Sequence, residues 1–129
     1  MSRYNWIDPS ALKMLHEESL ASFGGSRGMR DEGLFESALA RPQNHAHYNE
    51  TADISELAAS YAYGLAKNHP FVDGNKRAAF LSIGLFLGIN GHRLTASPVA
   101  AIKAIIALAA GDLSEEELAL WIKDHIEAK

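Results

Sequence analysis

The sequence predicts an all-α fold, a compact bundle of about six helices around a central buried helix. Helix-capping residues recur along the 129-residue chain, each before a segment of helical spacing. The segment from Asn75 to Gly91 is apolar and unbroken until the Asn-Gly pair that ends it, as is typical of a buried helix. No repeat, low-complexity tract or long linker interrupts this pattern, so residues 1–129 are predicted to form one domain.

The first helix is predicted to begin at Asp8-Pro9, where an N-cap residue precedes a proline in the expected order. It ends at Gly24-Gly25. Its inward-facing stripe is expected to consist of Leu12, Leu15, Ser19 and Phe23. The glycine-rich run that follows lacks the spacing of a phosphate-binding loop and follows a helix rather than a strand, so it is interpreted as a helix C-cap and turn.

The second helix is predicted from about Asp31 to Arg41, where Pro42 stops it. The polar segment from Gln43 to Ala52 has no helical period and is predicted to form a loop or a short extended flap. This segment contains His45, His47 and Glu50. Alternate residues of an extended segment share a face and could ligate a metal, but such residues in a polar loop are more often solvated.

The third helix is predicted from about Asp53 to Lys67 and leads the chain to His69. Three further helices follow it. The fourth is the apolar segment that begins at Asn75. The last two are predicted from Ser97-Pro98 to Ala110, closed by Gly111, and from the capping box Ser114–Glu117 to about Ile126.

The composition is that of a soluble globular protein, with 47% hydrophobic residues, 22% charged residues and a net charge of −4. A sequence pI near 5.8 gives no support to direct nucleic-acid binding. The absence of cysteine excludes disulfides, thiolate chemistry and cysteine zinc sites. No apolar signal or membrane segment is recognised, so no membrane partner is expected and the expected location is the cytoplasm.

The nine residues from His69 to Arg77, HPFVDGNKR, place a base, a carboxylate, an amide and two cations in one helix-to-helix loop. Lys76 and Arg77 fall in the first turn of the next helix, where the helix dipole favours negative charge. An anion bound there, receiving N–H bonds from Gly74 and Asn75 and charge from the two cations, would remove this conflict. The loop is therefore predicted to hold phosphate.

Two other side chains of the loop extend this prediction to a reaction. A carboxylate beside a phosphate is favourable when a divalent cation bridges them, so Asp73 is predicted to bind Mg²⁺. His69 is a candidate general base, because histidine accepts a proton near neutral pH. Taken singly, His69 could be a histidine at a helix C-terminus, Asp73-Gly74 a turn, and Arg77 the partner of a core-facing acid. Together the residues predict nucleotide-dependent group transfer to a hydroxyl.

The string resembles the signature of the Fic/Doc superfamily, His-Pro-Phe-x-Asp/Glu-Gly-Asn-Gly/Lys-Arg, at every specified position. The segment 23–43 is similar to the N-terminal half of the small Doc-like (death-on-curing) toxins. The resemblance implies a Fic fold over residues 1–129 and the use of ATP with Mg²⁺. It also implies the residue roles, which are His69 as catalytic base, Asp73 as metal ligand, and Gly74, Asn75, Lys76 and Arg77 as the nucleotide-binding residues.

Lys76 bears on which group is transferred. Fic enzymes that transfer AMP resemble one another in having glycine at this position, whereas Doc-like proteins have lysine and bind the nucleotide in the reverse direction. The resemblance thus implies a protein Ser/Thr kinase that transfers the γ-phosphate of ATP to a protein hydroxyl. The family substrate is elongation factor Tu, so arrested translation is expected. The Asp73-Gly74-Asn75 core is as Fic enzymes have it, which keeps AMP transfer to a protein as the alternative. A non-catalytic binding module is disfavoured by the complete motif.

Regulation is inferred from a missing string. Many Fic enzymes restrain themselves with a helix carrying Ser/Thr-x-x-x-Glu-Gly/Asn, and here Glu32-Gly33 is preceded four residues earlier by Gly28. The resemblance therefore implies a separate antitoxin whose C-terminal segment folds as a helix into a groove on this protein.

Overall fold

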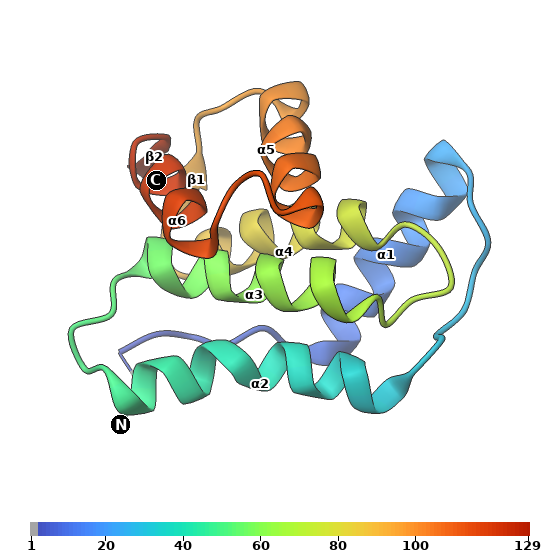
Figure 1. Ribbon diagram of the computed structural model, residues 1–129, viewed down its shortest axis with the longest axis horizontal. Coiled ribbons are helices and arrows are strands. Elements are labelled where there is room, and N and C mark those ends of the chain that lie inside the picture. Colours follow the sequence, from blue (N-terminus) through green and yellow to red (C-terminus); the bar gives the residue numbers. More distant parts are fainter. Residues whose placement is uncertain (1–2) are drawn as a thin grey trace.

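The computed structural model describes residues 3–129 as a helical bundle with one small two-stranded sheet. The elements are α1 (Pro9–Phe23), α2 (Glu32–Tyr48), α3 (Ile54–Asn68), α4 (Asn75–Ile89), β1 (His92–Leu94), α5 (Pro98–Ala110), α6 (Glu115–Lys123) and β2 (Ile126–Ala128). In Figure 1, α3 crosses the middle of the molecule, with α2 on one side and α5 and α6 on the other. The all-α prediction is confirmed.

The predicted helix starts are confirmed by their capping bonds. The side chains of Asp8, Asp53 and Ser97 each accept a backbone N–H of the helix that follows. Ser114 and Glu117 form the complete capping box at the start of α6, each accepting the other's backbone N–H. These local bonds fix where the chain turns into helix, and so they fix the loops between helices.

The centre of the bundle is formed by α3 and α4 together. Eleven of the 15 residues of α3 are buried, including Leu57, Tyr61 and Leu65. Gly64 of α3 lies so close to α2 that a Cβ there would be 3.1 Å from the Cα of Ala38. The core side chains that meet these two helices come from every other helix. The loop between α3 and α4 therefore connects the two most central helices of the bundle.

The predicted end of the second helix is wrong, because α2 continues through Pro42 to Tyr48. A proline inside a helix removes one backbone hydrogen bond and costs about 3 kcal/mol. Here Pro42 is buried, Ala46 packs against the core, and His45 reaches Glu56 of α3 at 3.3 Å. These contacts outweigh the local cost. The predicted extended flap is therefore helical over residues 43–48, and only residues 49–53 connect α2 to α3.

Two smaller expectations also need correction. Phe23 was expected on the inner stripe of α1, but it is 73% exposed, and the buried positions are Leu12, His16, Ser19 and Leu20. The last helix ends at Lys123, because the chain then forms β2, which pairs antiparallel with β1. Within residues 3–129 no helix has the length and apolarity needed to cross a membrane.

Candidate active site

His69 ends α3 in the left-handed conformation, with φ 50° and ψ 55°. Among the described residues it is the one non-glycine residue with positive φ, a conformation that costs roughly 1–2 kcal/mol for a residue with a Cβ. Arg30 holds it there, because its Nε donates to the carbonyl oxygen of His69 at 2.6 Å and its Nη2 donates to that of Asn68 at 2.7 Å. The left-handed turn leaves the side chain of His69 exposed at the surface. A side chain in this position is accessible to other molecules.

Asn75 closes the loop on itself. Its Oδ1 accepts the backbone N–H of Phe71 at 2.9 Å, and its Nδ2 donates to the carbonyl oxygen of Phe71 at 3.0 Å. Phe71 itself is buried, with its ring edge-on to that of Phe35. The side-chain amide of Asn75 therefore holds the loop, and Asn75 is also the first residue of α4.

The start of α4 differs from the other helix starts in how it is capped. Its N-cap is Gly74, with φ 75° and no side-chain cap, whereas Asp or Ser caps each of the other five helices of residues 3–129. The first backbone bond of α4 runs from the N–H of Ala78 to the carbonyl oxygen of Gly74. The N–H groups that precede it in the first turn have no helical acceptor, as at any helix start. They are positioned to bind an anion.

Lys76 and Arg77 add positive charge to this helix start. Lys76 is exposed and Arg77 is partly buried. The guanidinium of Arg77 lies 4.7 Å from the ring centroid of Phe23, the exposed aromatic residue at the end of α1, which is within the range of a cation–π contact. The ion pairs found within residues 3–129 use other cations, so Arg77 does not pair with a core-facing acid. Both charges are available to a phosphate group.

Asp73 is exposed and anchored by two backbone N–H groups. Its Oδ1 accepts from Gly74 at 2.9 Å and its Oδ2 accepts from Ser26 at 3.1 Å. Each oxygen keeps a further acceptor site. Nowhere in residues 3–129 do three His, Asp or Glu side chains gather into a group that could hold a metal ion on its own. A single fixed carboxylate fits Mg²⁺, which is commonly held by one or two carboxylates while phosphates and water supply its other ligands.

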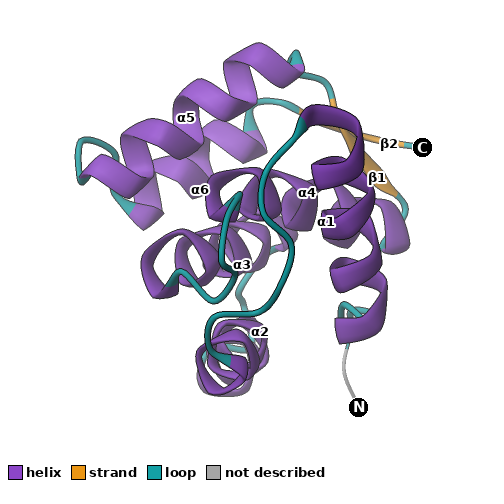
Figure 2. Ribbon diagram, turned by 90° about the vertical axis from the view of Figure 1, so that its right-hand side faces the viewer, coloured by secondary structure: helices purple, strands orange, loops and turns teal. Residues whose placement is uncertain are grey.

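The connection between α1 and α2 lies beside the loop and forms backbone hydrogen bonds with it. The backbone N–H of Val72 donates to the carbonyl oxygen of Gly28, and those of Arg30 and Asp31 donate to that of Pro70. Gly24 is the predicted C-cap of α1, confirmed by its N–H bond to Leu20. Gly25 is needed for close approach, because a Cβ there would be 3.1 Å from Oδ2 of Asp73. The two connections lie together on the side that faces the viewer in Figure 2.

His16 of α1 lies directly beneath the loop. It is 2% exposed, its Nε2 is 3.0 Å from the carbonyl oxygen of Asp73, and its ring centroid is 3.9 Å from that of Phe71. Its Nδ1 is buried and has no hydrogen-bond partner. Burial lowers the pKa of His16, against the raising effects of the Asp73 backbone and of the charges of Asp73 and Glu17. Sequence reasoning missed His16 and Arg30, because both reach the loop across tertiary contacts.

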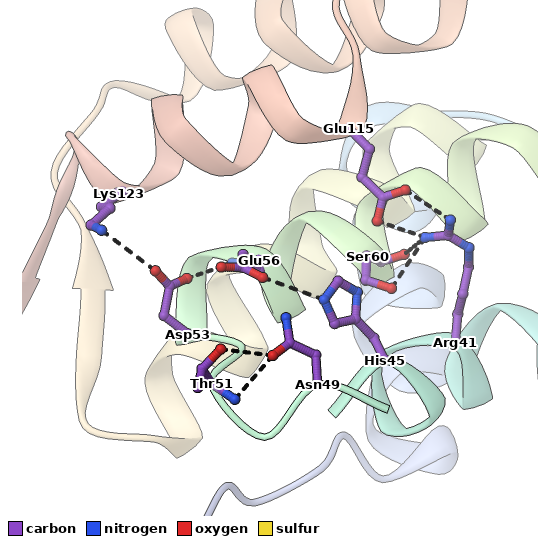
Figure 3. A network of polar contacts seen from close by, with 9 residues as sticks. All are labelled: Arg41, His45, Asn49, Thr51, Asp53, Glu56, Ser60, Glu115 and Lys123. Atoms are coloured by element: carbon purple, nitrogen blue, oxygen red, sulfur yellow. Dashed lines mark hydrogen bonds and ion pairs between the residues drawn. The ribbon is translucent and has the colours of Figure 1, made fainter. Parts of the chain in front are cut away.

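A cleft of about 490 Å³ lies elsewhere, between α2, the start of α3 and α6. Six of its ionisable side chains form three pairs, as Figure 3 shows. The pairs are Arg41 with Glu115 at 2.8 Å, His45 with Glu56 at 3.3 Å, and Lys123 with Asp53 at 3.6 Å. The hydrogen bonds that Arg41 donates to the carboxylate of Glu115 raise the pKa of Arg41. These pairs tie helices together, and the predicted metal interpretation of the His45 segment gains no support among the described residues.

Comparison with known proteins identifies the family of this chain. A sequence model of the Fic/DOC family matches residues 6–87, and the chain belongs to that family. Among relatives, it is 36% identical over 113 residues to "Protein kinase doc" of Escherichia phage P1, covering 88% of this chain and 89% of that protein. It is also 42% identical over 76 residues to "Toxin Doc" of Mycolicibacterium smegmatis, covering 58% of each chain.

Proposed function

We propose that this protein is a Doc-like toxin that transfers the γ-phosphate of ATP to a hydroxyl group of a protein, with elongation factor Tu as the substrate. The observation that carries the proposal is the uncapped start of α4, flanked by the exposed side chains of His69, Asp73 and Lys76. The similarity to a relative named as a protein kinase supports phosphoryl transfer.

In this reaction the first-turn N–H groups of α4, together with Lys76 and Arg77, bind the phosphates and stabilise the charge that develops in the transition state. Asp73 would hold Mg²⁺, which when bound neutralises phosphate charge. His69 accepts the proton of the substrate hydroxyl as that oxygen bonds to the γ-phosphorus. The bond between the γ-phosphorus and the β–γ bridging oxygen breaks, and ADP leaves.

Asn75, Arg30 and the segment 24–31 keep the loop in the shape that this chemistry needs. The backbone of Asn75 faces the phosphates, while its side chain holds Phe71. Arg30 fixes the carbonyl of His69 and thereby the direction of its side chain. A reaction of this kind depends on position more than on covalent chemistry, so supports of this sort contribute to the rate.

AMP transfer is the second candidate, because the Asp73-Gly74-Asn75 core is as AMP-transferring Fic enzymes have it. Lys76 opposes it, because the resemblance to the family implies that a lysine here occupies the room that the β and γ phosphates of an AMP donor need. A separate antitoxin is also part of the proposal, since the self-inhibitory string is missing from the sequence. The relative named "Toxin Doc" supports this pairing.

The experiment that tests the proposal is intact-mass analysis of elongation factor Tu after incubation with the protein, ATP and Mg²⁺. A phosphoryl-sized gain that His69→Ala abolishes is the expected result. An adenylyl-sized gain would establish the second candidate instead. If elongation factor Tu gains no mass but labelled phosphate is transferred to another protein in a lysate, the proposed substrate is wrong. The proposed reaction would still hold.

A further inference from the structure

We propose that His16 is a positioning residue for the candidate active site, holding the Asp73–Gly74 peptide so that the Asp73 carboxylate and the start of α4 keep one relative arrangement. This inference rests on the proposed function. His16 itself does not touch the nucleotide in this account. Its effect passes through the backbone of the loop.

The hydrogen-bond chemistry of His16 identifies its donor. A carbonyl oxygen only accepts, so the contact of 3.0 Å between Nε2 and the carbonyl oxygen of Asp73 requires the hydrogen on Nε2. In the neutral ring Nδ1 is then an acceptor, and it is buried without a partner. A charged ring would bury a second N–H with no acceptor, which is more costly still. The ring is therefore a neutral donor directed at one peptide.

Packing restricts the same peptide from a second direction. A Cβ on Gly74 would lie 2.9 Å from Cε1 of His16, so the ring is pressed against the Gly74 backbone. The other contact of the ring is with Phe71, at a centroid distance of 3.9 Å and an interplanar angle of 30°. Three residues of the loop thus meet one side chain of α1.

A purely structural role does not explain why this side chain is a histidine. An apolar side chain of similar size would fill the space without an unsatisfied buried nitrogen, which is unfavourable. Such a side chain could not hold the carbonyl of Asp73. Loss of that bond would free the Asp73–Gly74 peptide to rotate, and rotation would move the metal-binding carboxylate and the N-cap of α4 together.

The test compares His16→Gln with His16→Met. Gln and Met are close in shape, and the amide nitrogen of Gln extends about as far from the backbone as Nε2 of histidine, so the pair differs mainly in the donor. Leu12→Met, one helical turn earlier on the same buried face of α1, controls for repacking. Thermal unfolding establishes that each variant is folded, and calorimetry measures ATP binding over a series of Mg²⁺ concentrations.

The expected result is that His16→Met is folded and needs roughly tenfold more Mg²⁺ for half-maximal ATP binding, as for loss of an outer-shell support. Its kcat for transfer should fall by about 10²-fold with KM for the protein substrate little changed. His16→Gln and Leu12→Met should both remain near wild type. This pattern assigns the effect to the hydrogen bond and not to the volume of the side chain.

Two results would overturn the inference. One is equal Mg²⁺ dependence and kcat in His16→Met and His16→Gln, whether both are active or both impaired. The other is unfolding of both variants, which would make His16 a structural residue. If the wild-type protein shows no Mg²⁺-dependent ATP binding at all, the proposed function itself fails, and that outcome is distinct from either of these.

Discussion

Arg30 binds the carbonyl oxygen of His69 with its Nε at 2.6 Å, at the one described non-glycine residue whose φ is positive. An arginine from the α1–α2 connection thereby stabilises a backbone conformation that histidine does not favour by itself. Strain of this kind is found at active sites, where the surrounding structure holds a residue in place. Here it directs the side chain of the proposed base outward.

Replacing His69 by alanine and by glycine separates this strain from catalysis. Both variants lose the base, so kcat for transfer should fall by roughly 10²- to 10⁴-fold. Glycine adopts the left-handed conformation freely, so His69→Gly should be more stable than His69→Ala by about 1 kcal/mol. Urea unfolding measures the stability difference. Retained activity in His69→Ala would remove His69 from the mechanism.

Asn75 is expected to contribute to stability as well as to activity, because its amide satisfies both backbone groups of Phe71. Asn75→Asp keeps the acceptor and loses the donor, which should cost about 1 kcal/mol. Asn75→Ala loses both bonds and should cost about 2 kcal/mol. Chemical denaturation of the three proteins checks the order. Equal stability of Asn75→Ala and the wild type would show that the loop does not depend on this amide.

The ion pair between Arg41 and Glu115 is expected to be structural. Its two bonds of 2.8 Å link α2 to α6, with side chains 39% and 19% exposed. A double-mutant cycle with Arg41→Met and Glu115→Gln should give a coupling energy of about 1 kcal/mol, allowing for solvent screening. Transfer activity should be unchanged in all three variants. A tenfold loss of activity in Arg41→Met would give the cleft a functional role.

His16 should make stability depend on pH below neutrality. Burial lowers the pKa of folded His16 below its ordinary value of 6.5, so between the two values the unfolded chain binds the proton more readily. Its contribution is complete above pH 6.5 and is lost as the pH falls toward the lowered pKa. When the pH is lowered from above 6.5 to below it, the free energy of unfolding should therefore drop more in the wild type than in His16→Gln. Urea unfolding of both proteins on each side of pH 6.5 measures this difference. Parallel curves would show that burial does not oppose protonation of His16.

The helix starts could be predicted from the sequence because they depend on bonds between neighbours, such as that from the N–H of Ala100 to Oγ of Ser97. The loop residues His69 to Arg77 were predicted as one cluster because they are contiguous, and the structure brings them together. The end of α2 could not be predicted, because tertiary contacts beyond Pro42 decide it.

The two residues that hold the loop from outside could not be predicted either, because His16 lies 57 residues from Asp73 and Arg30 lies 39 residues from His69 in the sequence. One signal was present for His16. A histidine spaced four residues from Leu12 and four from Leu20 falls on the buried stripe of α1, where a polar ring needs a partner. Arg30 gives no such signal, because an exposed arginine in a glycine-rich segment is ordinary.

The backbone bonds from Val72 to Gly28 and from Arg30 and Asp31 to Pro70 join the loop 69–77 to a second segment of the chain. That segment is the connection between α1 and α2, so the loop 69–77 alone would lack these backbone hydrogen-bond partners. The two segments are separated by about forty residues of intervening chain, so their pairing carries the loop-closure entropy of a long-range contact. Formation of α3 and α4 alone therefore does not complete the loop, because its shape also depends on a segment that lies far away in the sequence.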